Sequence, residues 1–164
     1  MNPYLKQYKQ TQINTASKEE ILLMLYDGAV RFLHLAKQGF AEKNIEKIHN
    51  NIVKVQNIIT EFEASLDMKN GGEFAENLFA LYEFLSRQLS IANIKKQEDA
   101  LDIVIKHITE LRDTWREAVR KFKAEGNSLA DTSFDTAEYN SKQEYIDEDE
   151  DEESEDEDLG GYIL

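Results

Sequence analysis

Apolar side chains recur at steps of three and four residues through four consecutive segments, and this spacing constrains the fold more than any other feature of the chain. It gives residues 17–40 one apolar helical face, and between Ile45 and Leu66 it becomes a heptad pattern that lasts for about three heptads. Two further segments, residues 73–93 and 98–125, repeat the spacing. Because an amphipathic helix buries its apolar face against other helices, the pattern predicts an all-α fold, an antiparallel up-down-up-down four-helix bundle.

Residues that start and end helices lie between these segments. Ser17 and Glu20 have the capping-box spacing, in which reciprocal hydrogen bonds satisfy the first amides of a helix. Asn44 is a suitable N-cap for the second helix, and Lys-Asn-Gly-Gly at 69–72 is the clearest helix breaker. Gly28 lies inside the first helix, where it predicts a close approach by a neighbouring helix.

The distribution of charge divides the chain into a balanced domain and an acidic tail. The net charge is −14, yet residues 1–125 hold 18 basic and 18 acidic side chains. Residues 126–164 hold Lys142 against 15 acidic side chains, and residues 147–158 are acidic at 11 of 12 positions. Because like charges repel one another, we predict a disordered acidic C-terminal tail at 126–164 after a bundle domain at 17–125. The balanced domain lacks the basic surface that nucleic-acid binding requires.

Residues 1–16 precede the bundle and show no helical or strand periodicity, so we predict a loosely ordered N-terminal arm. A frayed terminus and a removable strap over an apolar surface are the two interpretations. The arm has no apolar core of a signal peptide, and the chain has no run of about 18 apolar residues. It also has no cysteine, which excludes disulfides and thiolate zinc sites. These features predict a cytoplasmic protein that does not insert into membranes.

Few residues have the spacing of a catalytic or metal site. Glu46 and His49 form an E-x-x-H pair, but a di-iron bundle needs a second such pair. His34 and Lys37 match part of the H-x-x-K-G pattern of histidine phosphotransfer bundles, with the glycine one position late. No phosphate-binding glycine loop or nucleophile elbow occurs. We therefore expect no enzyme activity, no metal and no cofactor.

Four stretches, taken in order, resemble the flagellin-specific export chaperone family (FliS). They are ILLMLYDGAVRFL after Thr15-Ala16-Ser17, LDMKNGGE at 66–73, Leu81-Tyr82 with Leu89 and Ala92-Asn93, and LRDTWREA at 111–118. The similarity covers about residues 4–120. Family members usually stop soon after the last of these stretches, so the acidic tail at 126–164 departs from the family pattern.

The resemblance implies a cytoplasmic, non-catalytic chaperone that binds the disordered C-terminal segment of flagellin in apolar grooves. Such a chaperone prevents premature polymerisation and assists type III flagellar export, with the export gate or a co-chaperone as further partners. The family also implies that the arm covers part of this surface in the free protein. Apolar side chains beyond the needs of a core would form the grooves. The predicted partner-binding residues are Leu5, Tyr8, Ile13, Met24, Ile58, Phe79, Tyr82, Ile91 and Asn93.

Two other functions stay open at this point. One is phosphotransfer through His34, and the other is an adaptor that acts through its acidic tail and uses the bundle as an anchor. For each apolar candidate, burial in the bundle is the alternative to a place in the groove, and Asn93 can instead cap its own helix. We expect a monomer or a weak homodimer.

Overall fold

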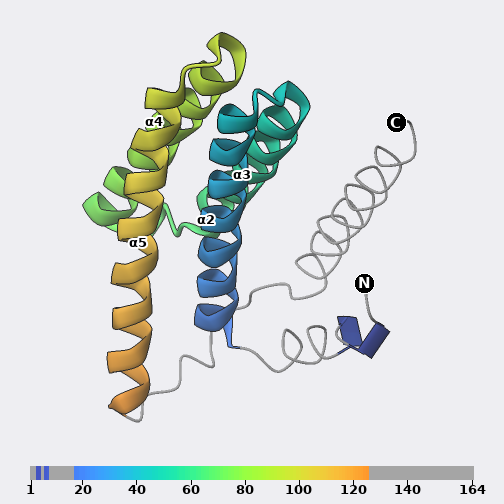
Figure 1. The fold of residues 1–164 in the computed structure, drawn as a ribbon. Coiled ribbons are helices and arrows are strands. Elements are labelled where there is room, and N and C mark those ends of the chain that lie inside the picture. The colour runs from blue at the N-terminus through green and yellow to red at the C-terminus, as the bar shows by residue number, and fades with distance from the viewer. Residues whose placement is uncertain (1–2, 5, 8–16, 126–164) are drawn as a thin grey trace. The chain divides into compact units, whose positions relative to one another are not determined.

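The computed structural model describes residues 3–4, 6–7 and 17–125. Within them four long helices follow one another: α2 (Lys18–Glu42), α3 (Ile45–Ser65), α4 (Gly72–Lys95) and α5 (Glu98–Ala124) (Figure 1). The predicted all-α four-helix bundle is confirmed. None of the described helices is long and apolar enough to cross a membrane.

Side-chain contacts show that successive helices run antiparallel, because residue numbers rise along one helix as they fall along its neighbour. The α2–α3 contacts are Tyr26–Phe62 and Phe32–Lys54, and the α3–α4 contacts are Phe62–Tyr82, Gln56–Ser90 and His49–Asn93. Helix α5 returns alongside α2, as the pairs Asp27–Arg116 and Lys37–Asp102 show. This order is the up-down-up-down arrangement that short connections between helices favour.

The helix ends follow the sequence signals. The Ser17 hydroxyl accepts a hydrogen bond from the Glu20 amide at 3.3 Å, and the Glu20 carboxylate accepts one from the Ser17 amide at 3.3 Å. This is the predicted capping box. Asn44 caps α3 by accepting a hydrogen bond from the Lys47 amide at 3.0 Å. Helix α4 ends at Lys95 and is capped by Lys96, whose φ of 51° is left-handed.

The predicted close approach at Gly28 is wrong, and the approach occurs instead at Gly39. A Cβ atom at Gly28 would meet only Ile58 Cδ1, at 3.9 Å, which is an ordinary van der Waals distance. A Cβ atom at Gly39 would lie 3.0 Å from both Cγ1 and the backbone nitrogen of Ile48 and 3.3 Å from the Asn44 carbonyl oxygen. Gly39 therefore lets the start of α3 pack closely against the end of α2.

The core is made of the faces that the spacing predicted. Large side chains with almost no exposed surface come from all four helices: Phe32, Leu33, Ile52, Ile59, Phe62, Leu85, Leu89, Leu101 and Ile108. Two predicted core positions differ, since Ile45 is 64% exposed and Phe74 is 75% exposed. Both lie in the first turn of a helix, where a side chain has neighbours on fewer sides than in the middle of the bundle.

The predicted acidic tail at 126–164 lies outside the described residues, and so does most of the predicted arm at 1–16. The arm positions Leu5, Tyr8 and Ile13 are among the residues that are not described. Their predicted contribution to partner binding stays a prediction.

Candidate partner-binding surface

Four of the predicted partner-binding residues have surface available to a partner. Phe79 on α4 is 38% exposed. Met24 on α2, and Ile91 and Asn93 on α4, are half-buried. An aromatic or aliphatic side chain that is only partly covered can pack against another chain without any change in the fold.

Two other predicted partner-binding residues lie in the core. Ile58 and Tyr82 are each 2% exposed. Ile58 lies off the heptad face of α3, yet it packs where α3 meets α2, with its Cδ1 3.9 Å from the position that a Cβ atom at Gly28 would take. A partner would reach either side chain only after the helices moved, so in the free chain both contribute to the stability of the bundle.

A buried tyrosine pair joins α2 to α4. The hydroxyl oxygens of Tyr26 and Tyr82 are 2.7 Å apart and share a hydrogen bond, and the Phe62 ring stacks on Tyr26 with centroids 4.3 Å apart. Burial raises the pKa of both phenols above the ordinary value of 10, although for Tyr26 the hydrogen bond to Tyr82 partly opposes this effect. Both hydroxyls therefore stay protonated, and each satisfies the other inside an apolar environment.

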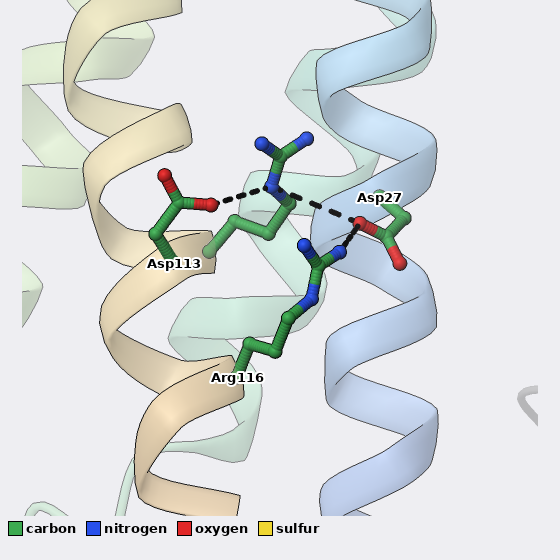
Figure 2. Close-up of polar contacts among 4 residues, drawn as sticks. Asp27, Asp113 and Arg116 are labelled. Carbon is green, nitrogen blue, oxygen red and sulfur yellow. Dashed lines mark hydrogen bonds and ion pairs between the residues drawn. The ribbon is translucent and has the colours of Figure 1, made fainter. Parts of the chain in front are cut away.

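An ion-pair network joins α2 to α5. The Arg116 guanidinium donates a hydrogen bond to the Asp27 carboxylate at 2.9 Å, and the Arg112 Nε lies 3.8 Å from the same oxygen (Figure 2). Arg112 also donates to Asp113 at 3.1 Å on its own helix. Asp27 and Arg116 are about half exposed, so solvent screens the pair and its contribution to stability is small.

Asn93 connects the end of α4 to the start of α3. Its amide nitrogen lies 2.9 Å from His49 Nδ1, and its oxygen accepts a hydrogen bond from Lys96 at 2.8 Å. The side chain therefore combines an interhelical contact with a contact near the C-terminus of its own helix. In the free chain both polar ends of the Asn93 amide have a partner.

Two carboxyl groups face each other across the α3–α4 interface. Burial, which has the larger effect, and the nearby Glu83 carboxyl raise the pKa of Glu63 above 4.5. One Glu63 oxygen is buried without a hydrogen-bond partner among the described residues. Ionisation of Glu63 in this place is therefore unfavourable for folding.

The residues considered for phosphotransfer and for metal binding do not come together as a site. His34 is exposed on α2, whereas Lys37 binds Asp102 and Glu98 at the start of α5. The hydrogen bond to Asp102 is the largest effect that raises the pKa of Lys37. No three histidine, aspartate or glutamate side chains in the described part of the chain gather as metal ligands would.

Comparison with known proteins identifies the family. Residues 1–122 match the family described as flagellar protein FliS. The chain belongs to this family. A flagellar secretion chaperone FliS of Bacillus subtilis is 36% identical over 119 residues, which cover 73% of this chain and 87% of the relative. A FliS of Vibrio cholerae is 33% identical over 115 residues, which cover 70% of this chain and 85% of the relative.

A solved structure supports the fold of the FliS family member described here. A crystal structure of a flagellar chaperone from bacteria superimposes with a TM-score of 0.59 at 16% identity. The alignment covers 73% of this chain and 99% of that structure. At this identity the comparison shows a shared helical fold, and the family membership rests on the sequence match. The relatives are named chaperones, which are not an enzyme class.

Proposed function

We propose that this protein is a cytoplasmic export chaperone that binds the disordered C-terminal segment of flagellin. It keeps the segment from polymerising early and assists its delivery to the type III flagellar export gate. The observation that carries the proposal is the family match over residues 1–122, with relatives that are named flagellar secretion chaperones. The gate itself, or a co-chaperone, is a further partner in this proposal.

The physical features of the bundle support a binding role. Phe79, Met24 and Ile91 keep exposed apolar surface on helices whose other side chains already fill the core of the bundle. A disordered segment that folds into an amphipathic helix can bury its own apolar face against such side chains. The proposal includes the arm residues Leu5, Tyr8 and Ile13. They would cover part of the binding surface in the free protein, and the bound segment would displace them.

Isothermal titration calorimetry with a flagellin C-terminal peptide of about forty residues tests the proposal. We expect saturable binding with a negative heat-capacity change, because apolar surface is buried as the segment folds. Phe79→Ser should weaken the binding at least about tenfold, as expected for an aromatic anchor. Phe74→Ser is the matched control, because Phe74 is a more exposed phenylalanine of the same helix that is not a predicted partner-binding residue.

The absence of binding by the full chain would refute the proposal. Phosphotransfer would then be tested by incubation with a phosphodonor and with a His34→Gln variant. If Phe79→Ser and Phe74→Ser weakened the binding equally, the chaperone function would still stand. Phe79 would then not be a specific contact of the flagellin segment.

A further inference from the structure

The outer edge of the α3–α4 interface presents an aromatic ring between carboxylates. Phe79 is partly exposed, and Glu76 and Glu83 are exposed on the same helix, three residues before it and four residues after it. Residues with this spacing lie along one face of a helix. Glu76 and Glu83 are therefore about 10 Å apart along the axis of α4, with Phe79 between them. Glu63 approaches Glu83 from α3.

Two carboxylates of this edge, those of Glu76 and Glu83, belong to exposed residues of α4. Among the ion pairs of the described residues, none brings a lysine or an arginine to Glu76 or Glu83. Repulsion from Glu83 also contributes to the raised pKa of Glu63. A cation placed here would relieve this repulsion.

We propose that the edge formed by Glu63, Glu76, Phe79 and Glu83 is a docking surface for a basic amphipathic helix of a partner protein. One apolar side chain of the partner would cover the Phe79 ring. The partner helix would also have a lysine or arginine about one turn before this apolar residue and another about one turn after it. These two cations would pair with the carboxylates, because residues one turn apart have the same spacing on both helices. A hydrated metal ion would make no use of the exposed ring, so the combination fits a peptide.

This inference goes beyond the proposed function, because it defines the charge of the bound helix and does not require that the helix belong to flagellin. Complementary charge contributes to the rate of association and to the choice of partner, and its effect falls as salt screens it. The exposed ring supplies the part of the affinity that salt does not screen.

The test uses the full chain and a helical peptide of about 15 residues that has leucines on one face and lysines on the other. Its affinity is measured by fluorescence anisotropy at low and at high salt. Glu76→Gln/Glu83→Gln should weaken binding about tenfold at low salt, because two exposed ion pairs are lost, and should reduce the dependence on salt. Phe79→Ser should weaken binding at both salt concentrations.

Two controls separate this surface from general attraction between charges. Glu46→Gln/Glu110→Gln removes two exposed carboxylates elsewhere on the bundle and should leave the affinity unchanged. A peptide with glutamates in place of the lysines should not bind. The acidic residues 147–158 are present in every variant, since none of the substitutions changes them. Circular dichroism confirms that each variant is folded.

Equal affinity of the original chain and the Glu76→Gln/Glu83→Gln variant would overturn the inference, because the peptide would then be held elsewhere. A parallel titration with the flagellin segment separates the two proposals. If the lysine peptide binds through Glu76 and Glu83 while the flagellin segment does not bind, the proposed function fails and the docking surface stands. If the flagellin segment binds while the lysine peptide is insensitive to these glutamates, only the docking surface fails.

Discussion

Two glycines of α2 differ in how closely α3 approaches them, and replacing each with alanine should have opposite effects on stability. Alanine in a helix interior is favoured over glycine by about 1 kcal/mol. At Gly28 the added methyl group would lie 3.9 Å from Ile58 Cδ1, so the full gain is retained. For a domain of this size, Gly28→Ala should raise the melting temperature by about 4 °C.

At Gly39 the same substitution meets the start of α3. The new methyl group would lie 3.0 Å from the backbone nitrogen of Ile48, which cannot turn away as a side chain can. Overpacking costs of about 1–3 kcal/mol exceed the gain in helix propensity, so Gly39→Ala should lower stability by up to about 2 kcal/mol. The two variants therefore have opposite signs although they make the same chemical change in one helix.

Urea denaturation followed by far-ultraviolet circular dichroism measures both effects. Ala80→Gly calibrates the scale, because Ala80 is exposed inside α4 and its replacement should cost about 1 kcal/mol through helix propensity alone. If Gly28→Ala and Gly39→Ala changed stability by the same amount, the closeness of α3 to Gly39 would not control the outcome.

Three further substitutions test the contacts between helices. Tyr82→Phe should lower stability by about 1–2 kcal/mol in urea denaturation, because it leaves the Tyr26 hydroxyl buried without its partner; an unchanged midpoint would contradict the shared hydrogen bond. Glu63→Gln should stabilise the protein at neutral pH, because the raised pKa means that ionising this carboxyl opposes folding. That benefit should be up to about 1 kcal/mol, reduced by solvent screening, and should disappear as the pH falls below the ordinary value of 4.5; a gain that persisted in acid would exclude ionisation as its cause. Asp27→Asn should cost about 0.5 kcal/mol at low salt and less at high salt, because its pair with Arg116 is exposed; a cost independent of salt would point to packing instead of charge.

The regular parts of this fold could be predicted from the sequence because they depend on local spacing. Ile52, Leu85 and Leu101 are buried where the helical period places them. The contacts that cross between helices depend in addition on how two helices are rotated and aligned. The Tyr26–Tyr82 hydrogen bond joins residues 56 positions apart, and nothing in the local spacing of either residue indicates it.

The candidate surface was harder to predict for the same reason. An apolar residue outside the main apolar face of its helix is buried only where atoms of a neighbouring helix lie beside it. Ile58 is buried where α3 packs against α2, whereas Phe79 keeps exposed surface on α4. The capping box at Ser17 was predictable, since both of its hydrogen bonds lie within four residues of sequence.

The position of Phe79 on a long, well-packed helix has a consequence for binding. Helix α4 is held by Leu85 and Leu89 in the core and by the Gln56–Ser90 hydrogen bond to α3. A side chain on such a helix loses little conformational freedom when a partner covers it, so more of the energy of apolar contact remains as affinity. In the proposed function, the disordered segment of the partner would bear most of the ordering cost. Substitutions that loosen α4 without touching Phe79 should therefore weaken binding as well as folding, and the loss in affinity should follow the loss in stability.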